Sequence, residues 1–257
     1  MRGIKICSQK NGEMGYGDLR RILELHQDTP AIPFANIGTT MKGAIDNLPI
    51  IQKTLKNLAI SKHYIHCDAA LSGTILPFVD SAQPFGFDHG TDSLSISGHK
   101  IIGSPVPCGV VLAKRENVTG IQPASGCVEY MGVLDTTLTG SCSGLALLLL
   151  WYALTSFGTA EASELAMKRQ VHNALKMAEY AARRLQLAGV PARRHNSLTV
   201  VFPRPTQAVV RKWQLAPQQE IAHLITMPSV TREQVDAFVC DLSVEHVELQ
   251  NSERLEI

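Results

Sequence analysis

The sequence predicts an α/β protein with a mainly parallel sheet, followed by a small α+β domain at the C-terminus. The first observation is an alternation of apolar helical patterns and short strand-like runs in the first hundred residues, which is typical of a parallel sheet flanked by helices. The second is a long amphipathic pattern over residues 159–189, after which strand-like and helical runs alternate again. We therefore expect a large domain over residues 1–158 and a small domain over residues 159–257.

Composition is that of an ordinary enzyme and excludes several classes of protein. The chain has 257 residues with 45% hydrophobic content, enough for a sizeable core. A formal net charge of +1 gives no reason to expect nucleic acid or a membrane as a partner. The six cysteines lack Cys-x-x-Cys spacing, so we expect reduced thiols in a cytoplasmic protein. The first 14 residues contain no apolar run of signal-peptide length.

The N-terminal elements follow from apolar spacing. A short helix is expected around residues 19–23, and residues 31–37 are expected to form a buried strand. A helix that covers the sheet is predicted where apolar residues recur at helical spacing: Leu48, Ile51, Leu55 and Leu58. It leads into a strand that ends at Asp68.

The later elements are predicted in the same way. A strand over residues 108–113 precedes a long polar connection, residues 114–139, of the length that lids and binding loops have. Residues 145–154 are all apolar, too few to span a bilayer, and predict a buried helix. Gly189 ends the long helix. Beyond it we expect strands over 198–202 and 223–227, helices over 207–215 and 231–242, and a frayed tail after residue 244.

A lysine in a glycine turn is the first candidate for chemistry. The strand-like run of residues 93–97 leads Lys100 into a turn formed by Gly98 and Gly103. A lone loop lysine is usually a solvated charge. Ser97 and His99 are small hydrogen-bond donors that could hold a phosphate beside this amine. An amine next to an anion site is what a pyridoxal phosphate Schiff base needs.

Pyridoxal phosphate also needs a carboxylate against its pyridine nitrogen, because the protonated ring accepts electrons from the substrate. Asp68 ends an apolar run rich in strand-forming residues. Ala69 and Ala70 follow it and are small enough to let a flat ring approach the backbone. Asp68 and Lys100 would then lie at strand ends, where α/β sheets bind their ligands.

The histidines near Asp68 do not predict a metal site. His63 and His66 are an odd number of residues apart, so a regular strand would point them to opposite faces. The cysteines and histidines show no ligand spacing either. We expect no metal, with His66 packed or hydrogen-bonded.

Several motifs together resemble a known family. Residues 36–46, 66–73, 97–100 and 103–109 are similar, in order and spacing, to the group II pyridoxal-phosphate-dependent amino acid decarboxylases. Within that group they resemble most the bacterial histidine decarboxylases and the plant serine decarboxylases. Residues 211–215 and 221–228 extend the likeness to nearly the whole chain.

The resemblance implies a fold type I enzyme that binds pyridoxal 5′-phosphate and converts an amino acid to its amine. Histidine, giving histamine, is the first expected substrate, with serine as the alternative. Thr39 or Thr40 would contact cofactor or substrate, although a capped turn explains both hydroxyls equally well. Tyr130 matches a loop tyrosine that returns a proton in the family, and its alternative role is an ordinary, partly buried tyrosine. A homodimer or homotetramer is expected if the chain is complete.

Two departures from the family keep a second class open. Relatives carry a substantial N-terminal part before the first match, so the large domain is expected to be incomplete. In relatives that part supplies a histidine that stacks on the cofactor and residues that hold its phosphate. Where relatives read Gly-Ser-Arg-Asn-Gly-His, residues 140–145 lack the arginine, asparagine and histidine. A truncated, non-catalytic remnant is therefore the alternative to an enzyme.

Overall fold

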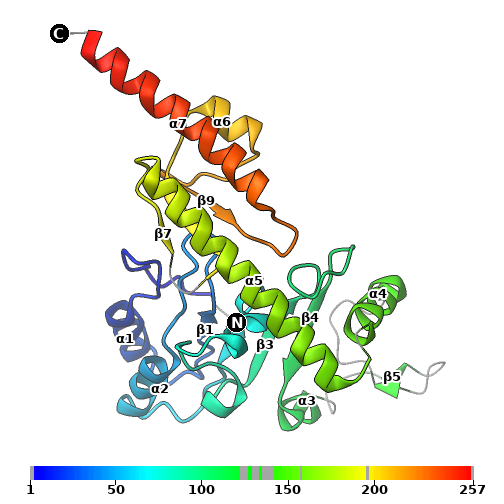
Figure 1. The fold of residues 1–257 in the computed structure, drawn as a ribbon. Helices are drawn as coiled ribbons and strands as arrows, with labels where there is room; N and C mark the ends of the chain where they lie inside the picture. The colour runs from blue at the N-terminus through cyan, green and yellow to red at the C-terminus, as the bar shows by residue number, and fades with distance from the viewer. Residues whose placement is uncertain are drawn as a thin grey trace.

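The computed structural model describes residues 3–121, 127–128, 133–134, 142–156, 158–194 and 197–255. The first sheet has the strand order β1-β2-β3-β4 (Figure 1). Its strands are β1 (Phe34–Asn36), β2 (His66–Asp68), β3 (Ser93–Ser97) and β4 (Gly109–Ala113). β1, β2 and β3 run parallel, whereas β4 runs antiparallel to β3. The predicted mainly parallel sheet is confirmed.

Two helices cover one face of this sheet. α1 (Tyr16–Leu25) and α2 (Leu48–Asn57) lie side by side next to β1 (Figure 1). The side chain of Asn47 caps α2 by accepting a hydrogen bond from the backbone N–H of Ile50. The apolar stripes of both helices pack on the alternate strand residues that share one face, and the buried set includes Leu19, Leu23, Leu48, Ile51, Leu55, Ala35, Cys67 and Leu94. The helical spacing in the sequence therefore predicted this layer correctly.

The strand expected over residues 31–37 is shorter and less buried than predicted. β1 has three residues, and its Phe34 side chain is 53% exposed. Ile32 is also exposed. The reason is that alternate strand residues point to opposite faces, and the face opposite to α1 and α2 is open at β1.

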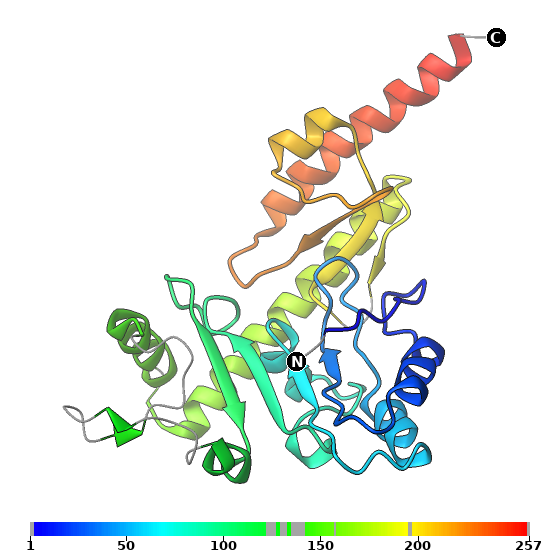
Figure 2. The ribbon, with the colours of Figure 1, turned by 180° about the vertical axis from the view of Figure 1, so that it is seen from behind.

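The C-terminal part forms a second sheet with its own core. α5 (Ala160–Leu187) begins at Thr159, whose hydroxyl accepts a hydrogen bond from the backbone N–H of Ala162. The antiparallel strands are β7 (Arg193–Arg194), β8 (Thr199–Pro203) and β9 (Ile221–Ile225). The helices α6 (Gln207–Lys212) and α7 (Arg232–Leu255) gather around them with α5 (Figure 2). The backbone of α7 is helical beyond residue 244, where a frayed tail was expected.

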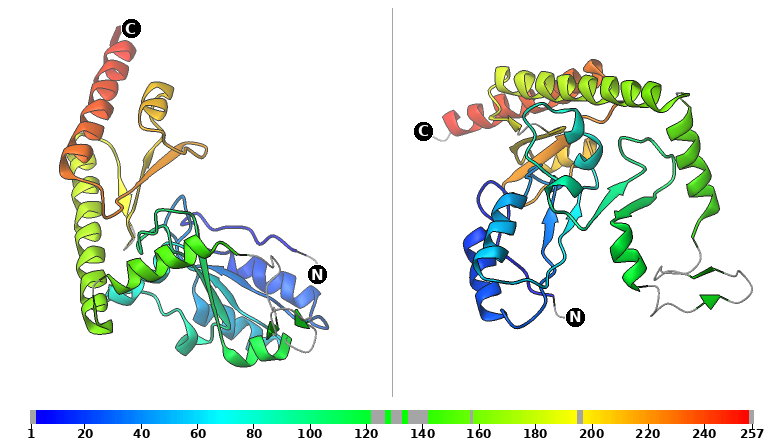
Figure 3. Two further views of the ribbon diagram at one scale, coloured as in Figure 1. Left: turned by 90° about the vertical axis from the view of Figure 1, so that its right-hand side faces the viewer. Right: turned by 90° about the horizontal axis from the view of Figure 1, so that it is seen from below.

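α5 connects the two parts of the molecule. It runs past both sheets (Figure 3). Its first half buries Val171 and Ala174 against Ile75 and Ile101 from the larger part. Its second half joins the core of the small sheet through Ala178 and other residues. The domain boundary expected between residues 158 and 159 stays a prediction.

The segment between β4 and α5 differs from the sequence prediction in two ways. The connection expected over residues 114–139 contains α3 (Arg115–Ile121) and the short pair β5 (Cys127–Val128) and β6 (Val133–Leu134). α4 (Gly144–Thr155) is a helix as expected, but it is not buried. Six of its large apolar side chains are exposed: Leu145, Leu147, Leu148, Trp151, Tyr152 and Leu154.

Within the described part of the chain, no single helix is long and apolar enough to cross a membrane. Taken together, α4 and α5 have the length and composition of a membrane-spanning segment, but they are bent by 91° relative to each other.

Candidate functional site

Three chain segments with polar side chains meet at the carboxyl edge of the parallel strands. Asp68 ends β2, Ser97 ends β3, and Gly38 with Thr39 follows β1. Backbone hydrogen bonds tie the segments together: the N–H of Ile37 donates to the carbonyl of Asp68, and the N–H of Ser97 donates to the carbonyl of Ala70. Carboxyl ends of parallel strands are where such sheets bind ligands. The expected convergence of Asp68 with the Lys100 segment is therefore present.

Asp68 is held by two donors. Its Oδ1 atom accepts a hydrogen bond from the backbone N–H of Ala70 at 3.2 Å and lies 3.5 Å from the hydroxyl of Ser95. The register aligns Asp68 with Asn36 on one side and Ser95 on the other. These three residues share the sheet face that α1 and α2 do not cover. A flat ring on this face could meet the carboxylate at its edge.

Ser95 is a contact that the sequence reasoning missed. The signal was present in the alternation of residues 93–97, because Ser95 lies two residues before Ser97 and so shares its face. Ser95 faces Asp68 across the β2–β3 pair. It therefore orients the carboxylate.

Lys100 lies in a tightly bonded turn after β3. Its N–H donates to the carbonyl of Ser97 at 3.3 Å, and the N–H of Gly103 donates back to the Lys100 carbonyl at 3.1 Å. Gly103 has a φ of +84°, which favours glycine. Ile101 is fully buried and anchors the turn. Lys100 itself is half-buried, whereas a lone loop lysine is usually solvated.

Gly98 explains how closely the turn is packed. A Cβ atom at this position would lie 2.6 Å from Sγ of Cys108 and 3.1 Å from Cδ1 of Leu150 in α4. Only glycine fits such an approach without a shift of its neighbours. α4 thus packs directly against the turn that carries Lys100.

His99 and Ser97 flank Lys100 as expected. The Nδ1 atom of His99 lies 3.1 Å from the backbone oxygen and 3.2 Å from the backbone nitrogen of Cys108, and the tautomer of the ring decides which of the two it bonds. His99 is exposed and Ser97 half-buried. Both side chains come from the turn that carries Lys100, so their donors suit a phosphate at the same place.

Thr39, in the turn after β1, has a structural role. The hydroxyl of Thr39 accepts a hydrogen bond from the N–H of Ala44 at 3.0 Å, and its carbonyl accepts one from Gly43. This is the capped turn that the sequence left as the alternative. Thr40 is exposed beside it. Tyr130 lies outside the described residues.

His66 packs on the same face as Asp68. Its ring lies 4.7 Å from the Phe34 ring, and its Nδ1 atom lies 2.7 Å from the hydroxyl of Ser93. Burial lowers the pKa of His66, and the negative charge of Asp68 opposes that change. Among the described residues, no three His, Cys, Asp or Glu side chains come together as metal ligands would.

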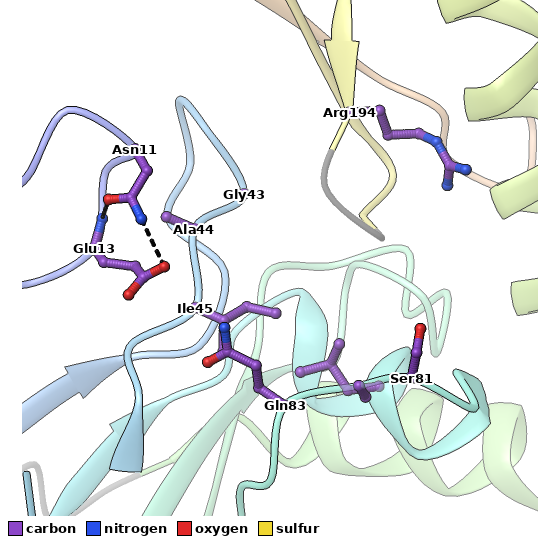
Figure 4. Close-up of a pocket in the computed structure, with 10 residues that line it drawn as sticks. Asn11, Glu13, Gly43, Ala44, Ile45, Ser81, Gln83 and Arg194 are labelled. Carbon is purple, nitrogen blue, oxygen red and sulfur yellow. Dashed lines mark hydrogen bonds between the residues drawn. The ribbon is translucent and has the colours of Figure 1, made fainter. Parts of the chain in front are cut away.

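A cavity of about 360 Å³ lies beside the hairpin that follows β1 (Figure 4). The hairpin after β1 contributes Gly43 and Ile45, and Arg194 of β7 lies on the far side. Glu13 lines it and accepts a hydrogen bond from the side chain of Asn11 at 2.7 Å. Neither Lys100 nor Asp68 lines this cavity.

The donor set at the sheet edge fits pyridoxal phosphate. An oriented carboxylate lies at the end of β2, and an amine with two neighbouring donors lies at the end of β3. Ala70 is small and lies between the two segments, with its carbonyl bonded to Ser97. Among the described residues, by contrast, no group of three or more His, Cys, Asp or Glu side chains could hold a metal ion.

Comparison with known proteins gives one family. A family model described as the pyridoxal-dependent decarboxylase conserved domain matches residues 1–201. The histidine decarboxylase of Pseudomonas entomophila (strain L48) is 46% identical over 243 residues, which is 93% of this chain and 58% of the relative. That of Morganella morganii is 50% identical over 222 residues, 85% of this chain and 57% of the relative. The chain thus spans less than three fifths of the length of these relatives.

Solved structures show the same fold. L-methionine decarboxylase from Streptomyces sp. 590, in complex with L-methionine methyl ester, is similar with a TM-score of 0.76 and 25% identity. The match covers 93% of this chain and 58% of that one. Mouse CSAD shares the fold with a TM-score of 0.69 at 16% identity, over 93% of this chain and 57% of that one. The expected fold type I architecture is confirmed.

Proposed function

The chain belongs to the pyridoxal-dependent decarboxylase family, and we propose on this basis that it takes part in the pyridoxal-phosphate-dependent decarboxylation of histidine to histamine. The observation that carries the proposal is the placement of Asp68 and Lys100 at the ends of neighbouring strands, tied together by the Ser97–Ala70 hydrogen bond. When bound, the cofactor supplies a protonated ring that accepts the electron pair left on the substrate α-carbon as carbon dioxide departs.

Each residue has a distinct part in this proposal. Asp68, oriented by Ser95, holds a proton at the pyridine nitrogen, because a carboxylate beside that atom favours its charged form. Lys100 supplies the amine that attaches the cofactor. Ser97 and His99 bind its phosphate, and Ala70 leaves room for the ring.

The remaining predicted residues have smaller parts. Thr39 positions the loop after β1 through its bond to Ala44, with Thr40 next to it. Tyr130 is proposed to return the proton to the substrate carbon. A tyrosine in that role must lie on a segment that can reach the Lys100 turn.

Histidine is the proposed substrate because the curated relatives compared above are histidine decarboxylases at 46% and 50% identity. Serine is the other substrate that the sequence suggests. We also propose the two-domain division at residues 158 and 159, a cytoplasmic location and a homodimer or homotetramer for the complete enzyme.

A non-catalytic remnant stays the second candidate, and one observation favours it. In the segment that departs from the family, Ser143 caps α4 by accepting a hydrogen bond from the N–H of Ala146 at 3.2 Å. A helix cap is a structural role and does not replace an arginine that binds anions.

Cofactor attachment tests the site. Purified chain is mixed with pyridoxal phosphate, reduced with borohydride, digested and analysed by mass spectrometry. We expect the cofactor mass on Lys100, and its loss in Lys100→Ala with a change in unfolding free energy of about 1 kcal/mol or less. Lys53→Ala, which changes an exposed lysine on α2, is the matched control and should label normally. Labelling of Lys100→Ala at the parent level would rule out the assignment.

Carbon dioxide release separates enzyme from remnant. The assay compares histidine with serine, for the chain alone and for the chain supplied with the part of the Morganella morganii enzyme that it does not match. We expect little or no release from the chain alone and release from histidine with the added part. Asp68→Asn should lower that release by about 100-fold or more, since an amide does not hold the ring nitrogen protonated. Full activity of the chain alone would contradict the expectation, and no activity in either form would favour the remnant.

A further inference from the structure

Gln170, on the first half of α5, reaches the turn that carries Lys100. Its Nε2 atom donates a hydrogen bond to the backbone carbonyl of Ile101 at 3.2 Å, although the two residues are 69 positions apart in the sequence. Ile101 directly follows Lys100, and Gln170 itself is half-buried. A side chain of α5 therefore holds a peptide carbonyl next to the candidate lysine.

The side chain of Ile101 is held by the same helix. It is fully buried and packs in one cluster with Val171 and Ala174 of α5. Apolar packing is non-directional, so it fixes how close the turn lies to α5 but not how its peptide groups are oriented. The hydrogen bond from Gln170 is directional, because such bonds weaken steeply when donor and acceptor are misaligned. It therefore sets the orientation of the backbone that follows Lys100.

α5 passes both sheets (Figure 3), and the small sheet fixes it close to this contact. Thr226, directly after β9, is fully buried, and its hydroxyl lies 3.0 Å from the carbonyl of Ala174 and 3.3 Å from that of Leu198. One hydroxyl proton serves one of these two acceptors at a time. Ala174 lies four residues after Gln170, so the two residues share one face of α5. The face that contacts the Lys100 turn is thus attached to the small sheet about one helical turn further along.

The turn also has hydrogen bonds of its own, which act differently. The N–H of Gly103 donates to the Lys100 carbonyl at 3.1 Å, and the N–H of Ser104 donates to the Gly98 carbonyl at 3.0 Å. These bonds lie within the turn, so they fix its shape. The bond from Gln170 comes from another element and fixes where the turn lies relative to α5.

We propose that Gln170 is a positioning residue for Lys100, which keeps the lysine in place for attachment of pyridoxal phosphate. The inference deepens the proposed function and rests on it, because Lys100 is taken as the residue that attaches the cofactor. A displacement of about 1 Å at a reacting group can cost on the order of 100-fold in rate. Gln170 therefore affects attachment by holding the backbone beside the lysine, without contact to the cofactor.

Hydrogen–deuterium exchange tests the position of the turn without any cofactor. Gln170→Met keeps the length of the side chain and removes the donor. In this variant the amides of residues 98–104 should exchange about fivefold faster or more, as the loss of one hydrogen bond predicts. Gln186→Met is the matched control, because the side chain of Gln186 on α5 donates to the carbonyl of Ala192 at 2.9 Å. It loses the same kind of bond and should leave residues 98–104 at the parent rate.

A second variant tests the donor itself. Gln170→Glu has nearly the same shape as the parent, and its ionised carboxylate cannot donate, whereas the protonated carboxyl group can. Exchange of residues 98–104, divided by the parent value at the same pH, should be raised at about pH 8 and should fall toward the parent value at about pH 5. The division removes the effect of groups that both chains share, such as His99. A purely structural role for Gln170 would give a ratio that does not change with pH.

Cofactor labelling measures the consequence for Lys100. Each purified chain is titrated with pyridoxal phosphate and reduced with borohydride, and the label on Lys100 is measured by mass spectrometry. The concentration for half-maximal labelling should rise about fivefold or more in Gln170→Met and stay at about the parent value in Gln186→Met. Circular dichroism confirms the fold of each variant.

Three results would overturn the inference. The first is parent-like exchange of residues 98–104 in Gln170→Met. The second is an equal rise in Gln186→Met, which would show a general loosening of α5. The third is faster exchange in Gln170→Met with unchanged labelling of Lys100. Failure of the proposed function gives a different result, because the parent itself would then carry no label on Lys100, while the exchange measurements would still decide whether Gln170 holds the turn.

Discussion

The two sheets of this molecule use apolar residues in different ways. In the small sheet, Phe202 of β8 is 1% exposed and packs edge-on against Phe238 of α7, with ring centroids 5.5 Å apart. In the large sheet, Phe34 of β1 is 53% exposed. Both are phenylalanines on strands, so the difference comes from what lies over each face. The small sheet has α5, α6 and α7 around it, whereas the large sheet has helices over one face.

This difference indicates where the site residues lie relative to the stable core. Asp68 shares its face with Phe34, on the open side of the large sheet. The opposite side of the same strand buries Cys67 completely. One strand therefore carries a packed core on one face and the candidate site on the other.

The largest expected effect contrasts the two phenylalanines. Phe202→Ala should lower the unfolding free energy by about 3–5 kcal/mol, because it leaves a cavity in a closed core. Phe34→Ala should change it by about 1 kcal/mol or less, since half of that side chain is already in water. Urea unfolding followed by circular dichroism measures both. Equal costs would show that Phe34 is covered in solution and would break the comparison.

Two glycines extend the comparison between the two parts of the molecule, with an expected loss of stability of intermediate size. Gly38 in the large part has a φ of +100°, and a Cβ there would run into the Ser72 side chain. Gly189 after α5 has a φ of +80°, with nothing within 4 Å of an added Cβ. Both alanine variants suffer the left-handed backbone penalty of about 1–2 kcal/mol, and Gly38→Ala should cost about 1–3 kcal/mol more from overpacking. Thermal unfolding with the Gly189→Ala variant as reference checks the order. A larger loss for Gly189→Ala would contradict it.

The smallest effect is a pH dependence in the small sheet. His223 of β9 is 9% exposed, its Nδ1 has no hydrogen-bond partner in the described part of the chain, and burial lowers its pKa. The unfolded chain then binds this proton more readily than the folded chain. The contribution of neutral His223 to the unfolding free energy is therefore present above the unfolded pKa of about 6.5. It is lost as the pH falls below that value.

Replacing this histidine isolates its share. In His223→Gln the fall in unfolding midpoint between pH 7.5 and pH 5 should be shallower than in the parent. His172→Gln, at an exposed position on α5, should leave the slope unchanged. A parent-like slope in His223→Gln would remove His223 from this role.

Much of the fold and of the candidate site could be predicted from residue order. Helical spacing of Leu48, Ile51 and Leu55 predicts α2, and the alternation of residues 93–97 predicts β3, because these periods reflect local geometry and one buried side. Asp68 and Lys100 stood out because each combines a strand end with small neighbours. Ser95 was missed although it has the same periodicity, since a serine on a strand has no distinctive signal until its partner across the sheet is known.

The sequence by itself determined the alternation of elements and the family, and it supplied the candidate residues for holding pyridoxal phosphate, since these depend on local periodicity and on short motifs. Only the tertiary structure decided that α4, apolar on all sides, is half exposed, and that β1 is buried on one face alone. Apolar content shows that a segment tends to be buried, but burial requires a second surface. That surface is supplied by the packing of distant segments, which local patterns do not contain.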